Sequence, residues 1–487
     1  MTNLMKPSGQ PALCVSALGV SLFAGLPAWA QETTTTTTGA VAAGPIRAPD
    51  LAVMAGMVNK GDTTWMLVSS ALVLMMAIPA LALFYGGLVR TKNMLSLLMQ
   101  LFMIVSLVAV IWVVYGYSLA FTGGSPYVGG LSKAFLAGVS TGTFAATFSN
   151  NVYIPEYAFV IFQMTFACIT PALIIGAFAE RIRFWPLMLF VVAWVTLVYF
   201  PVAHMVWYWA GPDFLPDAPT DYGLLWGMGA LDFAGGTVVH INAGIAGLVG
   251  CIVVGKRVGF NKEPMPPHSL TMTMIGASLL WVGWFGFNAG SNLEANGLAA
   301  LAFINTFVAT AAAALAWSLV EQVFHGRPSL LGAVTGALAG LVAITPASGF
   351  ASPMGALVLG LIVSPICYVF VSSVKRALGY DDSLDVFGVH CVGGIVGAIG
   401  TAIVANPSYG GQGWFDYTVF PAVPGSYDMA AQLVTQIKAV LETLVWSGGV
   451  TLVLLVVIKA VFGLRPSTED ERQGLDQTSQ GERAYNM

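Results

Sequence analysis

The sequence predicts an all-α polytopic membrane protein with eleven transmembrane helices, arranged as an inverted 5+5 repeat plus one C-terminal helix. Composition is the first reason: of 487 residues, 57% are hydrophobic and 9% are charged, whereas about 25% are charged in soluble domains. Mean hydropathy is +0.79. The other reasons are eleven long apolar runs and a histidine motif that occurs twice. The net charge of −4 gives no basis for a nucleic-acid partner.

Residues 1–30 have the pattern of a cleaved signal peptide. Lys6 precedes an apolar run over 12–27, and Ala28-Trp29-Ala30 is a small-residue cleavage site. The mature chain would then begin at Gln31, and residues 31–61 would form a flexible extracytoplasmic lead-in. An uncleaved first membrane helix is the alternative, but the apolar run is short for a span.

The eleven expected spans follow from the rule that about 20 apolar residues cross a bilayer. They form a transmembrane domain over 62–464, followed by a polar tail over 465–487. The expected spans are 65–88, 93–121, 156–179, 184–208, 234–255, 270–290, 296–321, 329–346, 353–374, 386–405 and 431–462.

The orientation follows from the distribution of Lys and Arg, which concentrate in cytoplasmic loops. One set of loops carries most of them, including Arg90, Lys92, Arg181, Arg257 and Lys375, whereas the opposite loops at 209–232 and 405–430 carry none. The basic side is therefore predicted to be cytoplasmic, with the N-terminus outside and the C-terminus inside. The odd number of spans agrees with this.

A repeated motif lies in the fifth and tenth spans. Asp232 precedes His240 by the same interval as Asp382 precedes His390, and small residues and glycines follow both histidines at matching positions. Because five spans separate the copies, the two helices run in opposite directions, as in many transporters with a substrate route at the repeat interface. Glycines at positions +4 and +7 permit close helix approach, so the histidines are expected to face each other.

Buried ionisable residues within membranes are costly and usually functional, although a single histidine can be a packing residue. A metal site would normally need a third ligand, and a bis-histidine haem site is conceivable. The remaining option is a hydrogen-bonded imidazole pair, with one free nitrogen donating and the other accepting. Such a pair suits a small neutral polar molecule.

Several longer stretches resemble the ammonium transporter (Amt) family, bacterial type, over about residues 62–487. They are FYGGLVRTKN (84–93), FQMTFACITPALIIGAFAERIRF (162–184), PVAHMVW (201–207), ALDFAGGTVVHINAGIAGLVG (230–250), GKRVGF (255–260), WFGFNAGS (284–291) and DVFGVHCVGGIVG (385–397). The resemblance implies a homotrimer in a bacterial inner membrane, no enzymatic activity and no cofactor.

The resemblance also implies roles for individual residues. Phe166, Trp207 and Ser291 would recruit ammonium in an outer vestibule, and Phe166 and Phe287 would form a gate. Trp284, His240 and His390 would line the pore below it. Each aromatic residue could instead be ordinary packing.

Asp232 and Asp382 would support the sites electrostatically, and both could also cap the N-termini of their helices. The sequence does not choose between these two roles.

Transport of ammonia follows from the apolar pore, because a dehydrated cation is costly there. Ammonium, unlike potassium, can lose a proton, and desolvation favours this loss. The sequence leaves open whether a proton accompanies the ammonia. The alternatives are an ammonium sensor of the same fold, or a haem- or metal-bearing membrane enzyme.

The C-terminal tail resembles the family's regulatory tail, which contacts neighbouring subunits and a cytoplasmic PII-type signal protein. The matching residues are Glu471, Arg472, Gly474, Leu475 and Asp476, and Gln473 departs from the usual glutamate. A disordered end is the alternative.

Overall fold

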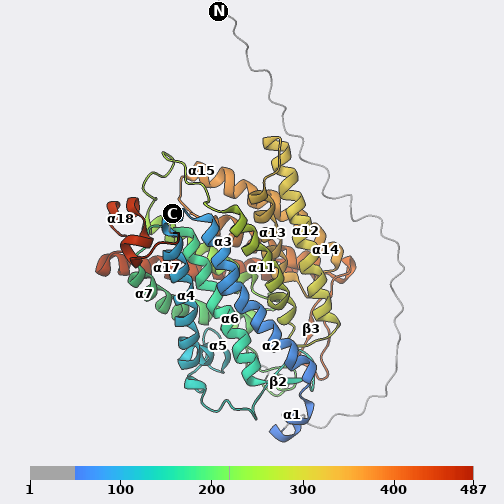
Figure 1. The fold of residues 1–487 in the computed structure, drawn as a ribbon. Helices are drawn as coiled ribbons and strands as arrows, with labels where there is room; N and C mark the ends of the chain where they lie inside the picture. The colour runs from blue at the N-terminus through green and yellow to red at the C-terminus, as the bar shows by residue number, and fades with distance from the viewer. Residues whose placement is uncertain (1–49, 219, 486–487) are drawn as a thin grey trace, which may run out of the picture. The chain divides into compact units, whose positions relative to one another are not determined.

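The computed structural model describes residues 50–218 and 220–485. The predicted signal peptide and most of the predicted lead-in lie outside the described residues. The chain divides into two units, 1–45 and 46–487, and everything below concerns the second unit, whose helices are coloured by position in Figure 1.

Eleven helices in the described residues are long and apolar enough to cross a membrane, which confirms the predicted fold class. Several are composite, because a short π-helical or 3₁₀ segment interrupts the regular helix. In the first half, the spans consist of α2 (Lys60–Met75), η2 (Met76–Ala80) and α3 (Leu81–Leu88); η3 (Thr91–Asn93), α4 (Met94–Ile111), η4 (Trp112–Gly116) and α5 (Tyr117–Phe121); α6 (Glu156–Ile174) and η6 (Ile175–Phe178); α7 (Phe184–Trp194), η7 (Val195–Tyr199) and α8 (Phe200–Trp207); and η8 (Gly236–Ile241) and α10 (Asn242–Val254).

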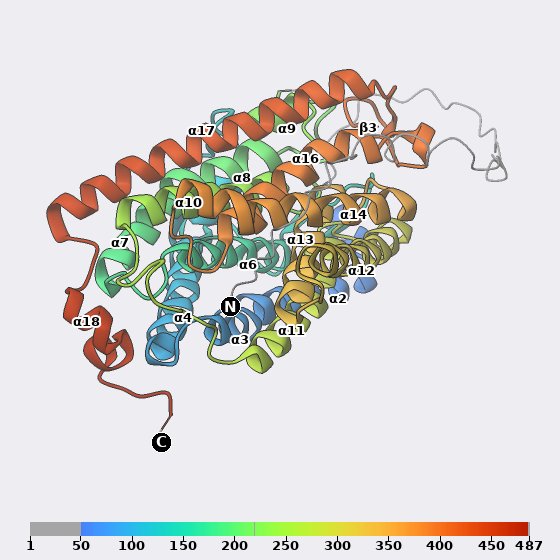
Figure 2. The same cartoon turned by 90° about the horizontal axis from the view of Figure 1, so that it is seen from above.

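The second half continues the same pattern and adds the last span. Its spans consist of α11 (Leu270–Gly290); α12 (Gly297–His325); α13 (Leu330–Ile344) and η9 (Thr345–Ala347); α14 (Pro353–Val369), η10 (Phe370–Val374) and α15 (Lys375–Leu378); η11 (Phe387–Cys391) and α16 (Val392–Val404); and α17 (Met429–Phe462). The long α17 packs along α7, α10 and α16, and Figure 2 shows it beside them.

The first span begins earlier than predicted. The side chain of Asn59 accepts hydrogen bonds from the backbone N–H groups of Gly61 and Asp62, and this cap starts α2 at Lys60. Within the lead-in predicted over 31–61, the described residues include the short helix α1 (Leu51–Met57), and Val58 pairs with Tyr153.

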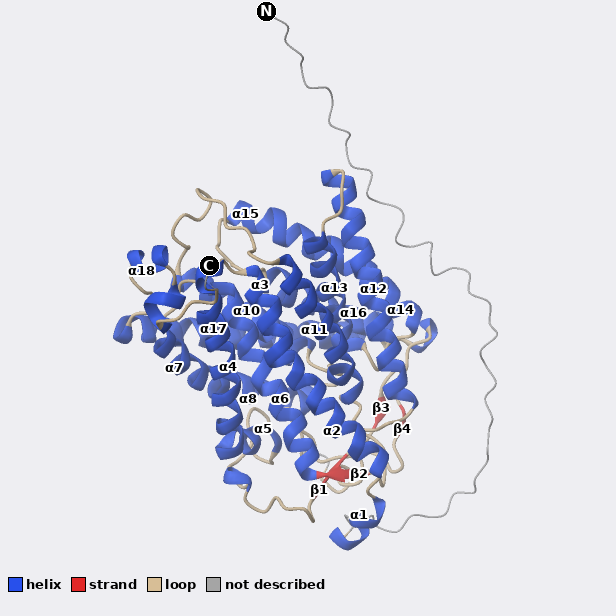
Figure 3. Cartoon of the chain, viewed as in Figure 1, coloured by secondary structure: helices blue, strands red, loops and turns tan. Residues whose placement is uncertain are grey.

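The connections between spans gather at two opposite ends of the helices. One end, here called the vestibule end, holds α9 (Leu224–Gly227), η5 (Ala134–Leu136), η12 (Pro407–Tyr409) and the strands β1 (Phe144–Ala146), β2 (Tyr153–Pro155), β3 (Phe415–Asp416) and β4 (Val423–Pro424). The strands form two small antiparallel hairpins, visible in Figure 3. The sequence did not predict these strands. The other end, here called the basic end, carries the Lys- and Arg-rich loops, α18 (Thr468–Gln473) and η13 (Asp476–Gln480).

The two copies of the repeat cross in opposite directions. The start of each span packs against the body of the other, since η8 contacts α16 and η11 contacts α10. The +4 glycines lie at this crossing. A Cβ on Gly244 would stand 2.4 Å from the backbone nitrogen of Cys391, and one on Gly394 would stand 2.9 Å from a side-chain carbon of Ile241. The glycines therefore allow the approach that the sequence predicted.

Candidate functional site

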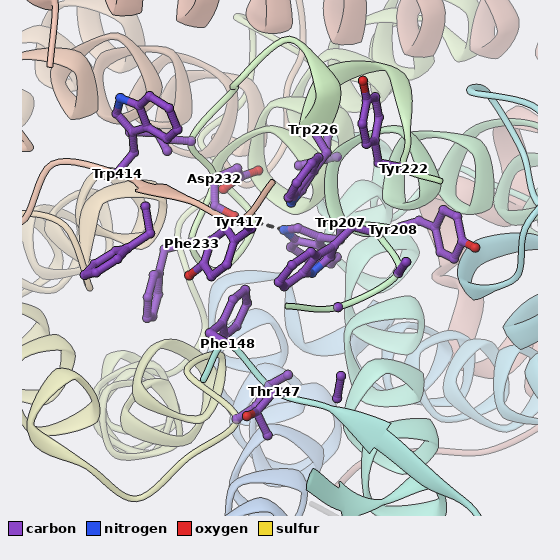
Figure 4. A pocket seen from close by; sticks show the side chains of 18 of the residues that line it. Thr147, Phe148, Trp207, Tyr208, Tyr222, Trp226, Asp232, Phe233, Trp414 and Tyr417 are labelled. Atoms are coloured by element: carbon purple, nitrogen blue, oxygen red, sulfur yellow. Dashed lines mark hydrogen bonds between the residues drawn. The ribbon is translucent and has the colours of Figure 1, made fainter. Parts of the chain in front are cut away.

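A cavity of about 1140 Å³ occupies the vestibule end of the spans. Phe166, Trp207 and Ser291 all line it, and Figure 4 shows Trp207 among the surrounding aromatic side chains. The Trp207 indole donates a hydrogen bond to the carbonyl oxygen of Asp232 at 2.9 Å. This bond fixes the ring beside the loop that leads into η8.

Ser291 presents an acceptor to this cavity. Its hydroxyl donates its own hydrogen to the carbonyl oxygen of Phe287 at 2.8 Å. A hydroxyl oxygen has two lone pairs, so the Ser291 oxygen keeps the capacity to accept a hydrogen bond from a ligand. The ring of Phe166 meets that of Trp207 edge-on, with centroids 5.7 Å apart.

Two stacked phenyl rings separate this cavity from a second, deeper one. Phe166 and Phe287 have centroids 4.2 Å apart and planes inclined by 30°. Both side chains are buried, with about 1% of their surface exposed. Phe166 lines the large cavity and Phe287 lines the small one, so the pair forms the barrier between them.

The deeper cavity has room for one small molecule. Its volume is about 10 Å³, close to the space that a single water molecule needs. His240, His390, Trp284 and Phe287 line it together with aliphatic side chains. The Trp284 ring stacks on His240 with centroids 5.4 Å apart, and its indole donates to Thr345 at 2.9 Å.

The two histidines face each other across the repeat. Nδ1 of His240 lies 3.2 Å from Nδ1 of His390, a distance at which one ring donates a hydrogen bond to the other. Two neutral imidazoles linked in this way leave one free nitrogen as donor and one as acceptor. Nε2 of His240 is buried and has no hydrogen-bond partner.

Each histidine lies in a π-helical segment, His240 in η8 and His390 in η11. In both copies the residue five before the histidine has positive φ, namely Gly235 at 116° and Asp385 at 59°. Glycine adopts this conformation freely, whereas an aspartate there is strained. Segments of π-helix inside α-helices are frequent at functional sites, and here each one sets the direction of a histidine.

Asp232 and Asp382 both cap these segments. The Asp232 carboxylate accepts from the backbone N–H groups of Gly236 at 2.5 Å and Thr237 at 2.8 Å. Asp382 accepts from those of Val386 at 3.1 Å and Phe387 at 2.8 Å. The relative positions are the same in the two copies, so the capping role that the sequence left open is present in both.

A buried network of charges joins the loops of the basic end. Arg90 binds Glu180 at 2.6 Å, and Arg257 binds Asp381 at 2.8 Å and approaches Glu180 at 3.5 Å. Burial alone would raise the pKa of Glu180, but the bond from Arg90 and the charge of Arg257 hold it below its usual range. Burial lowers the pKa of the Arg181 guanidinium to about 10. The network ties together loops from both halves of the repeat.

The tail residues pack on the basic end of the same chain. Glu471 binds Arg465 at 2.5 Å, and Gly474, with φ of 112°, lies against Lys92. The Leu475 N–H donates to Asn93 at 2.9 Å. Asp476 accepts from the N–H of Ser96 at 2.8 Å, close to the start of α4. The described part of the tail is therefore ordered, and Lys92 also bonds to the Arg472 carbonyl.

Both cavities include residues that the sequence did not predict. Tyr85 and Leu280 line the deep cavity, and Tyr85 belongs to the stretch FYGGLVRTKN. The vestibule also includes aromatic residues that no motif identified, namely Phe148, Trp209, Tyr222, Trp226 and Tyr417. For Trp209, Tyr222, Trp226 and Tyr417, the signal in the sequence was the density of aromatic residues in loops without Lys or Arg.

Among residues 50–218 and 220–485, no three or more His, Cys, Asp or Glu side chains gather closely enough to hold a metal ion. The two Nδ1 atoms lie 3.2 Å apart, which is within hydrogen-bond distance. Those two nitrogens therefore bond to each other in this arrangement.

The fold and the site define a multi-pass membrane protein of the transporter class, with a repeat interface that encloses a small polar centre. Comparison with known proteins identifies the family. The sequence model of the Ammonium Transporter Family matches residues 64–485, and the chain belongs to this family.

The most similar relatives include two bacterial ammonium transporters. One from Bacillus subtilis (strain 168) is 45% identical over 428 residues, covering 87% of this chain and 98% of the relative. One from Aquifex aeolicus (strain VF5) is 44% identical, covering 88% and 94%.

Two solved structures share the fold. The chain matches Saccharomyces cerevisiae Mep2 with a TM-score of 0.74 and 31% identity, covering 85% of this chain and 89% of Mep2. It matches a sensor Amt protein with a TM-score of 0.75 and 26% identity, covering 86% of this chain and 98% of the other.

Proposed function

We propose that this chain recruits ammonium in the vestibule, removes a proton near the Phe166–Phe287 pair and conducts ammonia past His240 and His390. The observation that carries the proposal is the unpartnered Nε2 of His240, in a cavity that fits one small molecule. Ammonia both donates and accepts hydrogen bonds, so it can satisfy an imidazole pair that offers one nitrogen of each kind.

Selectivity against potassium follows from the same cavity. A bare cation that enters an apolar space loses several kcal/mol or more of hydration unless a charge compensates it. Within the part of the chain that the structure describes, no carboxylate lines the deep cavity. Potassium has no proton to lose, whereas ammonium can cross as a neutral molecule.

The recruitment step uses groups that favour a cation. Aromatic faces attract ammonium ions with about 0.5–2 kcal/mol, and Trp207 and Phe166 supply such rings at the vestibule floor. The Ser291 oxygen supplies a hydrogen-bond acceptor. Desolvation between the phenyl rings lowers the pKa of the bound cation, and an imidazole or a water chain takes the proton.

We further propose that the vestibule end faces outward and the basic end faces the cytoplasm of a bacterial cell, in the inner membrane. The distribution of Lys and Arg supports this orientation. On the family resemblance, residues 1–30 are a cleaved signal peptide, three copies form a homotrimer, and a PII-type protein docks at the basic end near the tail. The orientation can be tested with single cysteines introduced in 405–430 or in 326–329. A thiol reagent that cannot cross the membrane, added outside intact cells, should label only the cysteines in 405–430.

Proteoliposomes containing the full chain test the transport proposal. Ammonium and methylammonium should enter, potassium should not, and current measured with the flux will show whether a proton accompanies each ammonia. Equal permeation of potassium and ammonium would refute the proposal.

The structural similarity to a sensor Amt protein supports a second candidate, an ammonium sensor. A pure sensor would bind ammonium in the vestibule and pass none through, so an absence of flux with preserved binding would favour it.

A further inference from the structure

We infer that the vestibule is also a binding site for ammonium ions that carry an apolar group, R–NH₃⁺, such as benzylammonium. The ammonium head would take the place of the substrate beside Trp207, so this part rests on the proposed function. The apolar group would lie on a separate cluster of aromatic residues, here called the outer aromatic cluster: Phe148, Trp209, Tyr222, Trp226 and Tyr417.

The size of the vestibule is the first reason. Its cavity measures about 1140 Å³, slightly above the range of pockets that hold drug-sized ligands. An ammonium ion is about the size of a water molecule, whose share of liquid volume is about 30 Å³. The cavity is therefore far larger than recruitment of ammonium requires.

The outer aromatic cluster is the second reason. Trp209 stacks on Trp226 with centroids 5.1 Å apart, and it lies 4.8 Å from Tyr417 and 5.9 Å from Phe148. Tyr222 adds a contact to Trp226 at 5.2 Å. All five residues line the cavity and are half-buried. They come from three separate loops, and together they expose apolar surface to a water-facing space, which is typical of a ligand site.

Other residues already hold these loops together. The Asp213 carboxylate accepts hydrogen bonds from the side chain of Asn150 at 3.0 Å and from the Tyr153 hydroxyl at 2.5 Å. Asn150 also accepts from the N–H of Ala422 at 3.0 Å, which joins the third loop. These polar contacts join the three loops independently of the aromatic rings.

Charge is the third reason, and it selects a cation. Five carboxylates line the cavity and take part in no ion pair among the described residues: Asp217, Asp221, Asp232, Asp416 and Asp428. Lys133, the one basic side chain in the lining among the described residues, is paired with Glu156. An apolar body with a positive head therefore matches both features of the cavity.

The head site and the outer aromatic cluster are close enough for one small molecule to reach both. Trp207 and Trp209 are two residues apart, so their Cα atoms are separated by at most about 7 Å. In the view of Figure 4, Trp226, Tyr417 and Phe148 are drawn around Trp207. One or two methylene groups plus a phenyl ring cover this distance.

Calorimetric titration of the purified full-length protein in detergent tests the inference. The probes are methyl-, butyl-, hexyl-, benzyl- and phenethylammonium, with benzyl alcohol as the neutral analogue. We expect Kd to fall about 3- to 4-fold per buried methylene, and benzyl alcohol to bind at least 10-fold more weakly than benzylammonium. A Kd that is the same across the series would overturn the inference.

Variants locate the ligand. Trp209→Leu and Tyr417→Leu should each raise the Kd of benzylammonium at least about 5-fold, as expected for loss of an aromatic contact with its phenyl ring. The Kd of methylammonium should stay within about 2-fold. Trp185→Leu is the matched control, because Trp185 is 76% exposed and lies in α7 at the basic end; it should change neither value.

Uptake of methylammonium separates this inference from the proposed function and reports folding. If wild type takes up methylammonium but benzylammonium binds equally to wild type, Trp209→Leu and Tyr417→Leu, only the outer aromatic cluster is refuted. If wild type takes up no methylammonium, the proposed function fails instead. Trp226→Leu replaces either variant that loses uptake.

Discussion

The important property of His240 and His390 is which of their nitrogens remain free. Their Nδ1 atoms are occupied with each other at 3.2 Å, so the Nε2 atoms are the ones available to a molecule in the deep cavity. A single histidine in this place would need another partner for Nδ1. The chemical unit is therefore the pair, and each ring fixes the tautomer of the other.

Replacement of either histidine should impair transport. His240→Ala and His390→Ala should each lower specific methylammonium uptake by at least about 10-fold, and the double variant should be little worse than the more severe single one, because residues that act as a unit are not additive. His325→Ala is the control, since His325 is exposed at the end of α12. Uptake and potassium exclusion that are unchanged in both single variants would contradict the role of the pair.

Phe166 lines the vestibule and also forms half of the barrier between the two cavities. Phe166→Ala should weaken discrimination at the outer site, and the ratio of ammonium to methylammonium affinity in competition uptake should change by at least about 3-fold, the scale of one cation–π contact. Phe285→Ala is a matched control, because Phe285 stacks on Phe303 at 3.9 Å and lines neither cavity. An unchanged competition profile in Phe166→Ala would exclude this role.

At the scale of helices, the crossing of α10 and α16 determines where the histidines lie. Each π-helical segment starts its span, is capped by an aspartate and packs against the body of the opposite span. The crossing is close because glycine occupies the +4 position in both copies. A side chain there would separate the two helices and with them the two imidazoles.

Gly244→Val should therefore destabilise the protein more than a typical helix substitution does. The added Cβ would meet backbone of Cys391 at 2.4 Å, and overpacking of this kind costs typically 1–3 kcal/mol. Gly449→Ala in α17 is the control, because nothing lies within 4 Å of its added Cβ and alanine favours a helix by up to about 1 kcal/mol. Thermal unfolding in detergent should show a lower midpoint for Gly244→Val and an equal or higher one for Gly449→Ala; equal midpoints for both would argue against the close crossing.

At the scale of the whole described unit, buried carboxylates have different partners at the two ends. At the vestibule end, Asp213 and Asp232 are buried and accept hydrogen bonds from neutral donors. At the basic end, buried carboxylates face arginines, as Glu180 and Asp381 do. The vestibule end therefore retains uncompensated negative charge, which favours the approach of cations from that side.

Asp382 makes the stability of this unit dependent on pH. Burial raises the pKa of its carboxyl from 3.8 to about 6, with Lys375 opposing and Asp385 reinforcing the shift. A group with a raised folded-state pKa stabilises most below its unfolded pKa, and that contribution is lost as pH rises through about 6.

The side chain of the Asp382→Asn variant cannot ionise, so this variant should not lose that contribution to stability as the pH rises. Relative to wild type, its free energy of unfolding should rise by about 1–3 kcal/mol between pH 4 and pH 7.5. Thermal or denaturant unfolding at several pH values measures the difference. A difference between the two proteins that is the same at every pH would contradict the expected titration.

Much of the fold could be predicted because membrane helices follow simple physical rules. The apolar runs determined the eleven spans, and the positions of Asp232, His240, Asp382 and His390 revealed the antiparallel repeat. The end residues of the spans could be predicted less closely, because they depend on local caps such as Asn59. The outer aromatic cluster could not be predicted, since loops far apart in the sequence meet there and carry no periodic pattern. The tail docking was missed for the same reason.

The docking of the tail on α4 has a consequence for how the protein is made. The Leu475 N–H donates to Asn93, and the Ser96 N–H donates to Asp476; these bonds join residues 382 and 380 positions apart. The second of the eleven spans is synthesised early, yet the groups that complete its N-terminal turn are synthesised only after the last of the eleven spans. A nascent chain can insert all these helices into the bilayer and still lack these contacts. Completion of the basic end therefore follows the synthesis of all eleven spans, and a chain truncated after residue 465 would never achieve it.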